Sequence, residues 1–303
     1  TWVVGAMYLV GLCALGPGMQ IGTIIALSSY AWRFWQPMLS LSNLYNTFIN
    51  AVAYLERIFE MMDEPVTVDD APGATMLPPI QGAVSFQDVT FSYDGTVNVL
   101  ESFNLEVKPG ESIALVGPTG AGKTTVVNLL SRFYNLTGGQ VLLDGHDIAG
   151  VTLQSLRSQM GIMLQDSFIF SGTIMDNIRY GRLDPTDEEV IAAAKTLFAH
   201  EFISQMEDGY NTQVNERGSR LSQGQRQLVA FARTLLSDPK ILVLDEATSS
   251  IDAKTEKLVQ QGLQALLKVS TSFIIAHVLY TIKSCDRILY IADKGIAEMG
   301  SHG

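Results

Sequence analysis

Gly117-Pro118-Thr119-Gly120-Ala121-Gly122-Lys123-Thr124 is the stretch that decides the fold of this chain. The apolar run SIALV (112–116) precedes it and a helical pattern follows, which predicts a strand, a glycine-rich loop and a helix. Glycines let backbone N–H groups approach phosphate oxygens, and the helix N-terminus adds a partial positive charge. We therefore expect a phosphate-binding loop, in which Lys123 reaches the β- and γ-phosphates and the Thr124 hydroxyl holds Mg²⁺. A glycine-rich turn without a ligand is the alternative.

A second constellation is the apolar run ILVLDE at 241–246, which predicts a buried strand. Asp245 and Glu246 stand at its carboxyl end, where ligands bind in open α/β sheets. Asp245 can hold Mg²⁺ directly or through water, and Glu246 can act as general base on the attacking water. An apolar strand that ends in two acids is common, so this pattern gains its meaning from the phosphate loop upstream.

The third constellation is Leu221-Ser222-Gln223-Gly224-Gln225, which precedes the helical run LVAFARTLL. Ser222 has the position of an N-cap residue, with free backbone N–H groups beyond it. The pattern predicts a second helix N-terminus suited to phosphate, although taken alone it indicates only a capped helix.

The rest of the second part of the chain alternates short strands with helices. AVSFQDVTFSY (83–93) alternates apolar and polar residues, and QVLLDG, SFIIAH and RILYIAD are further apolar runs. A helical pattern runs from Lys123 to Tyr134. Strands that alternate with helices imply a parallel sheet covered by helices, which we place in one domain at 81–303.

The first part of the chain has a different composition, because residues 1–31 contain no charged residue and no histidine. Two apolar stretches, 2–15 and 19–35, flank a Gly-Pro-Gly turn, and spanning a bilayer takes roughly 20 helical residues. The interpretation we favour is two membrane helices, with Tyr30, Trp32 and Trp35 clustered like an interfacial belt. A signal peptide would need a basic start, and a buried soluble helical hairpin is the remaining alternative.

Residues 38–62 keep a helical period and gain charge, so a helix over about 19–62 would be roughly 60 Å long and would leave the membrane. We assign residues 1–64 to the end of a transmembrane domain and the Pro-, Gly- and Asp-rich residues 65–80 to a linker. The chain opens on Thr1 within an apolar run and stops at 301–303 just after a strand-like stretch. We therefore expect it to be a piece of a longer protein.

Composition excludes some classes of function. The chain has 303 residues and a formal net charge of −11, and no basic block offsets that charge, so we expect no nucleic-acid partner. Its two cysteines, Cys13 and Cys285, lie far apart and show no metal-type spacing.

Residues 81–303 resemble the ATP-binding cassette (ABC) family, because they contain a phosphate loop, an LSxGQ motif and a strand ending in Asp-Glu in that order. The resemblance implies an α/β P-loop NTPase domain of ABC type, with a parallel sheet core, an antiparallel β subdomain and an α-helical subdomain, preceded here by the helical membrane segment. Residue by residue, the resemblance implies a site for ATP and Mg²⁺ in which Tyr93 stacks on the adenine and Gly117 to Thr125 bind the phosphates. Thr124, Gln165 and Asp245 would hold Mg²⁺. The catalytic residues would be Gln165, Glu246 and His277, and Asp252 would be the D-loop residue.

YLERIFEMMDEP, before the linker, is similar to the end of the last membrane helix in half-size exporters with fused membrane and ATPase domains, of multidrug or lipid type. The resemblance implies a plasma-membrane exporter with a cytoplasmic ATPase domain and a second ABC subunit, identical or different, whose Ser222 and Gly224 close over the ATP. Lipid, drug and peptide substrates all stay open. Two departures are Gln223 within the signature and Val278-Leu279-Tyr280 after His277. A soluble ABC-type ATPase and a regulatory nucleotide-binding module are the rival functions.

Overall fold

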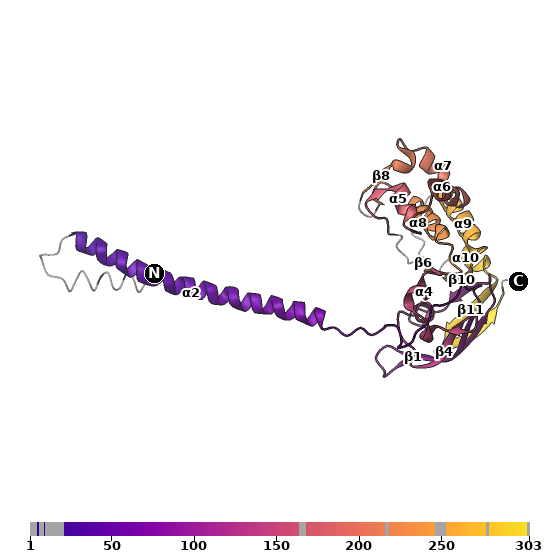
Figure 1. Ribbon diagram of the computed structural model, residues 1–303, viewed down its shortest axis with the longest axis horizontal. Coiled ribbons are helices and arrows are strands. Elements are labelled where there is room, and N and C mark those ends of the chain that lie inside the picture. Colours follow the sequence, from indigo (N-terminus) through magenta and orange to yellow (C-terminus); the bar gives the residue numbers. More distant parts are fainter. Residues whose placement is uncertain are drawn as a thin grey trace. The chain divides into compact units, whose positions relative to one another are not determined.

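The computed structural model describes residues 5, 9, 21–163, 168–215, 218–245, 253–276 and 279–301. The chain forms two compact units, Thr1–Val66 and Thr67–Gly303, which are described separately below (Figure 1).

The first unit contains the helix α2, Ile21–Met62. Its 42 residues make a helix about 63 Å long, which confirms the long helix that the sequence predicts over 19–62. Pro37 lies inside this helix. Within the described part of the chain, no helix combines the length and the apolar character needed to cross a membrane. The apolar stretch predicted at 2–15 lies outside the described residues, apart from Gly5 and Leu9.

The second unit is built on a six-stranded sheet with the strand order β12-β11-β3-β10-β9-β6. All neighbours in it are parallel except the edge pair β11 and β12. The bounds are β3 Ser112–Val116, β6 Met160–Met163, β9 Ile241–Asp245, β10 Thr271–Ile275, β11 Arg287–Ala292 and β12 Gly295–Gly300. The predicted parallel core is therefore present, and it carries an antiparallel edge strand that the sequence pattern did not indicate.

The central strands are apolar throughout because both faces of the sheet are covered. In β3, Ile113 and Leu115 point into one hydrophobic cluster, whereas Ala114 points into the other. In β9, Ile241 and Val243 join the first cluster, whereas Leu242 and Leu244 join the second.

An antiparallel sheet of order β2-β1-β4-β5 packs its apolar side chains into the first cluster. Its strands are β1 Val84–Ser92, β2 Asn98–Val107, β4 Gly138–Leu143 and β5 His146–Asp147. This is the predicted antiparallel subdomain, and β1 shows the expected alternation, with Val84 and Phe86 buried and Ser85 and Gln87 half-buried.

The remaining elements are mainly helical, and α5, α6, α8 and α9 gather at the opposite end of this unit from β1 and β4 (Figure 1). They supply the second hydrophobic cluster and form the predicted α-helical subdomain. The bounds are α3 Lys123–Leu130, η1 Ile148–Gly150, α4 Leu153–Arg157, β7 Gly172–Thr173, α5 Ile174–Arg179, α6 Asp187–Thr196, α7 His200–Ser204, η2 Gly209–Asn211, β8 Gln213–Val214, α8 Gln223–Leu236, α9 Ala253–Leu267 and α10 Leu279–Lys283.

Helix α3 is shorter than the predicted helix over 123–134. Ser131 is its C-cap and Arg132 has a φ of 50°, which takes the backbone out of the helix. The Arg132 guanidinium donates to the carbonyl oxygens of Ile148 and Val151, at 3.1 and 2.8 Å, so contacts distant in sequence fix this turn.

Residues 67–80, which we call the strap, differ from the linker that their composition indicates. The backbone amides of Leu77 and Ile80 donate to the side chains of Ser155 and Gln159, both at 2.9 Å. Leu77 and Ile80 are themselves buried in the first hydrophobic cluster. The strap is therefore bound along the second unit, because its backbone amides find partners on α4 and just after it, and its two apolar side chains lie in the core.

Candidate active site

The phosphate loop lies between the central strand β3 and the helix α3. Gly117, Gly120 and Gly122 have φ values of 145°, 82° and 104°, a region that side chains with a Cβ rarely adopt. A Cβ on Gly117 would lie 2.2 Å from the carbonyl oxygen of Ile291 on the neighbouring strand. The three glycines thus permit the backbone course of the loop, and Gly117 is also required for its close contact with β11.

Lys123 is the first residue of α3, and its side chain folds back over the loop. The Nζ atom donates to the carbonyl oxygens of Gly117 and Pro118, each at 2.8 Å, and the residue is buried. An ammonium group has three N–H donors, so one remains for a ligand. The first amides of a helix also lack intrahelical partners, and the exposed Thr124 adds a hydroxyl at the same point. This end of α3 is therefore an anion-binding position next to a hydroxyl that can bind a metal.

Asp245 ends β9 at the same edge of the sheet. It pairs with Ile275 of β10, and Ile275 in turn pairs with Leu115 of β3. Asp245 therefore lies level with the residue two positions before the loop, two strands away, which is about 10 Å at the usual strand spacing. The half-buried carboxylate and the Thr124 hydroxyl are oxygen donors of the kind that Mg²⁺ prefers, so the residues present fit this ion.

Tyr93 follows β1, and its ring is fixed beside α3. Its hydroxyl lies 3.0 Å from Oγ1 of Thr125, which is buried in α3. The turn after Tyr93 is held by Asp94, whose carboxylate accepts from the backbone amides of Thr96 and Val97. Hydrogen bonds from Thr96, and then from Val97 and Ser92, lower the pKa of Asp94 well below its ordinary range, so it stays ionised. The exposed aromatic ring therefore has a fixed position close to the phosphate-loop helix.

Ser222 is the N-cap of α8, as its sequence position predicts. Its Oγ accepts from the Gln225 amide at 3.3 Å, and its own amide donates to the Gln225 side chain at 2.9 Å, which completes a capping box. Leu221 and Gly224 on either side are buried, whereas Ser222 is exposed. An exposed hydroxyl thus stands at the positive end of a 14-residue helix.

A family model described as ABC transporter matches residues 100–249. The chain belongs to the ABC transporter family. It is 48% identical over 292 residues to the uncharacterized ABC transporter ATP-binding protein YfiC of Bacillus subtilis, covering 96% of this chain and 48% of that protein. It is 43% identical over 285 residues to the fatty acid ABC transporter ATP-binding/permease protein of Mycobacterium tuberculosis, covering 94% of this chain and 45% of that protein.

Among solved structures, a bacterial Atm1-family ABC exporter with ATP bound matches with a TM-score of 0.75 and 38% identity. The match covers 99% of this chain and 53% of that exporter chain. The chain thus spans about half the length of the curated relatives that it matches.

The described part of this ABC chain brings together some of the predicted site residues. The loop from Gly117 to Thr125, Tyr93 and Asp245 meet around β3 and α3. The signature residues Leu221 to Gln225 begin α8, which packs among α5, α6 and α9. The predicted residues that lie outside the described part are Gln165, Glu246, Asp252 and His277.

The sequence motifs do not include two residues that lie near the site. Tyr134 packs its ring against Tyr93, with 5.0 Å between centroids, and Arg132 binds the strap through the carbonyl oxygen of Asp69 at 2.9 Å. Both lie in the turn after α3. The signal in the sequence that could indicate a partner for Tyr93 is the aromatic residue Tyr134 so soon after the phosphate-loop helix.

Proposed function

We propose that this chain is the ATP-binding and ATP-hydrolysing part of an ABC exporter, which couples hydrolysis to the export of a substrate across a membrane. The observation that carries the proposal is the phosphate loop, where Lys123 folds over the loop and Asp245 ends the strand two positions away at the same end of the sheet. Positive charge, helix amides and an acidic group close together suit a Mg²⁺–triphosphate.

In this proposal Thr124, Asp245 and Gln165 hold Mg²⁺, which when bound neutralises charge on the β- and γ-phosphate oxygens. Lys123 binds the same phosphates, and Tyr93 stacks on the adenine. Glu246 takes a proton from the attacking water as general base, while Gln165 orients that water and His277 contacts the γ-phosphate. The last three assignments rest on the family pattern in the sequence.

The site also needs a second ABC subunit, identical to this one or different. The exposed hydroxyl of Ser222 at the start of α8 suits the γ-phosphate of an ATP held by the opposing subunit, together with Gly224. Asp252 of the D-loop belongs to the same contact. ATP then joins the two ATPase domains, and hydrolysis lets them separate, which moves the attached membrane helices.

We further propose that residues 1–64 belong to a multi-pass membrane domain, with residues 81–303 forming the ATPase domain on the cytoplasmic side of the plasma membrane. In support, apolar side chains along α2 are widely exposed, with Phe34 and Leu41 each 67% exposed. The match to the fatty acid ABC transporter ATP-binding/permease protein covers 94% of this chain, which is more than residues 81–303 alone. Lipid bilayer and a second subunit are the partners that would cover this surface.

Hydrolysis is tested with the substitution Glu246→Gln in the intact protein. The matched control is Asp238→Asn, since Asp238 is an exposed carboxylate on the turn after α8. We expect ATP binding to persist in Glu246→Gln while steady-state hydrolysis falls at least about a hundredfold, as loss of a general base implies. The control should keep its turnover. Unchanged turnover in Glu246→Gln would remove Glu246 from the role of general base.

Fractionation of cells that express the intact protein tests the exporter against a soluble ABC ATPase. We expect the protein in the membrane fraction and resistant to extraction by high salt and alkaline buffer. Recovery of an active, monomeric protein in the soluble fraction would contradict the exporter proposal while leaving the ATPase proposal standing.

A further inference from the structure

The ring of Tyr93 is held by contacts on more than one side. Phe91 and Tyr134 meet it nearly at right angles, with interplanar angles of 84° and 89° and centroid separations of 4.8 and 5.0 Å. Its hydroxyl bonds to Thr125. The ring nevertheless remains 51% exposed, so two aromatic neighbours and a hydrogen bond fix its plane while half of its surface stays available.

Edge-to-face contacts fix an orientation in a way that ordinary apolar packing does not. The positive edge of one ring prefers the negative face of the other, and the energy falls when either ring turns. Phe91 is buried in β1 and belongs to the core, so its place is set by the fold. Tyr134 is 42% exposed, and its ring also meets Phe91 at a centroid separation of 5.7 Å, so Phe91 and Tyr134 together form the aromatic support of Tyr93.

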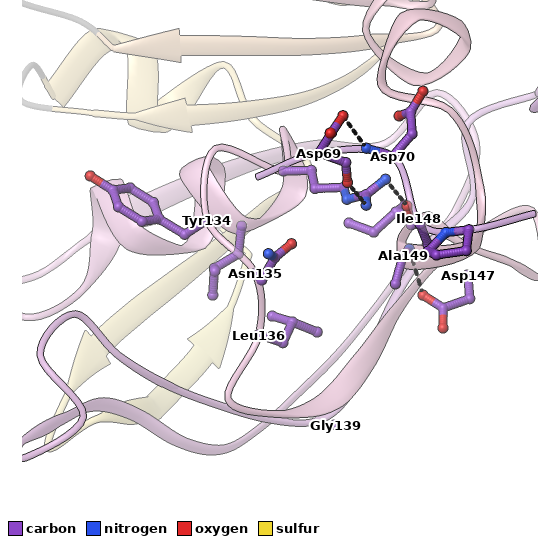
Figure 2. Close-up of a pocket in the computed structure, with 13 residues that line it drawn as sticks. Asp69, Asp70, Tyr134, Asn135, Leu136, Gly139, Asp147, Ile148 and Ala149 are labelled. Carbon is purple, nitrogen blue, oxygen red and sulfur yellow. Dashed lines mark hydrogen bonds between the residues drawn. The ribbon is translucent and has the colours of Figure 1, made fainter. Parts of the chain in front are cut away.

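The backbone on both sides of Tyr134 is anchored. Arg132 donates to the strap carbonyl of Asp69 at 2.9 Å, and Asn135 donates to the strap carbonyl of Thr67 at 3.0 Å. Tyr134 therefore sits on a short turn that is pinned to the strap at two points. Tyr134 is one of the residues around a pocket of about 500 Å³ that Asp69, Asn135 and Ile148 also line, and Figure 2 shows its ring directed away from those three residues.

We infer that Tyr134 is a positioning residue for nucleotide binding, which holds the ring of Tyr93 in the orientation that leaves one face available to the adenine base. The inference rests on the proposed ATP site, and it adds a residue to that site. Tyr134 acts through Tyr93 and touches no phosphate, so its effect belongs to recognition of the base and not to the triphosphate.

The test compares two ligands in the intact protein: ATP, and inorganic tripolyphosphate, which has no base. We expect Tyr134→Ala to weaken ATP binding about two- to tenfold, the range that one aromatic pair supports, and to raise the KM for ATP while kcat stays unchanged. Tripolyphosphate binding should not change. Tyr134→Phe keeps the ring edge and should restore wild-type affinity for ATP.

Phe133→Ala is the matched control, because Phe133 lies in the same turn and is 43% exposed, but its ring packs against Arg157 at 5.0 Å and not against Tyr93. We expect it to bind both ligands normally. Equal weakening of ATP by Phe133→Ala and Tyr134→Ala, or equal loss of ATP and tripolyphosphate in Tyr134→Ala, would reduce Tyr134 to a structural role and overturn the inference.

Lys123→Ala separates failure of the inference from failure of the proposed site, since it should abolish binding of both ligands. If the unsubstituted protein bound no ATP, the proposed function and the inference would fall together. If ATP bound in the unsubstituted protein and Tyr134→Ala bound it equally well, the inference alone would be wrong.

Discussion

Replacement of Arg132 by Met should release the strap from the rest of the ATPase unit. Arg132 is only 5% exposed, and it donates to Ile148 and Val151 on one side and to Asp69 of the strap on the other. Among the described residues, Arg132 forms no ion pair with a carboxylate. The guanidinium therefore acts as a charged donor to three backbone carbonyls. Methionine keeps most of the apolar stem and removes all three bonds.

The size of the effect follows from those contacts. A hydrogen bond with a charged donor contributes about 1.5–3 kcal/mol, so the three together stabilise the junction of the strap, η1 and the turn after α3 by several kcal/mol. Burial of the charge, with an Nε atom that finds no partner among the described residues, offsets a large part of that gain. We expect a net loss of about 2–4 kcal/mol of local stability, which corresponds to a fall of roughly thirty- to a thousandfold in hydrogen-exchange protection.

Hydrogen exchange measured by mass spectrometry on the intact protein is the assay. The amides to follow are those of Thr75, Leu77 and Ile80, which bond to Gly150, Ser155 and Gln159. Arg182→Met is the matched control, since Arg182 is 43% exposed and pairs with Glu189 on the surface, where such pairs contribute little.

Unchanged exchange in the strap of Arg132→Met would refute the reasoning. It would mean that the buried side chains of Leu77 and Ile80 hold the strap without the guanidinium. Equal loss of protection in Arg182→Met would show that any lost arginine loosens the unit, and would refute it as well.

Three further predictions follow from single residues. Gly117→Ala should abolish ATP binding, because its Cβ would lie 2.2 Å from the Ile291 carbonyl oxygen and force the loop away from the sheet. Isothermal titration calorimetry measures this loss. Ser222→Asp should leave the thermal midpoint of the intact protein unchanged, since aspartate also caps helices, but it should sharply lower steady-state ATPase activity. Ser222→Ala should lower the ATPase activity and also cost about 1 kcal/mol of stability. Hydrogen bonds from Thr173 hold the pKa of Asp176 below its ordinary 3.8, so its contribution to stability is present above about pH 4 and is lost as the pH falls through the lowered pKa. In a plot of the thermal unfolding midpoint against pH, Asp176→Asn should therefore show a smaller fall at acid pH than the unsubstituted protein.

The parts of the fold that the sequence predicts are those with a local cause. The loop glycines, the apolar run ending at Asp245 and the N-cap at Ser222 each depend on neighbours within a few residues. Such patterns keep their meaning without knowledge of the tertiary fold. The order of the strands in the sheet follows from the family pattern and not from any of these runs taken alone.

The strap and the turn after α3 could not be predicted in this way. Arg132 bonds to backbone carbonyls, and its partner Asp69 lies 63 residues earlier in the chain. A carbonyl is present at every residue, so the sequence around Asp69 contains no sign that it will be chosen. The Pro- and Gly-rich composition of the strap correctly indicates irregular backbone, but irregular backbone can be firmly bound when side chains satisfy it, as Gln159 does for Ile80.

Ser222 shows how one side chain can serve the fold and the proposed ATP site at once. Its oxygen accepts from the Gln225 amide, which is a folding role within its own helix. A hydroxyl has a hydrogen to donate as well, and Ser222 is exposed, so that hydrogen can reach a phosphate on an opposing subunit. Aspartate supplies the acceptor but has no hydrogen to donate at neutral pH, and its charge repels a triphosphate. The aspartate variant therefore separates the two roles: if it hydrolyses ATP normally, the hydroxyl serves only to cap α8, and Ser222 has no part in a site shared between two subunits.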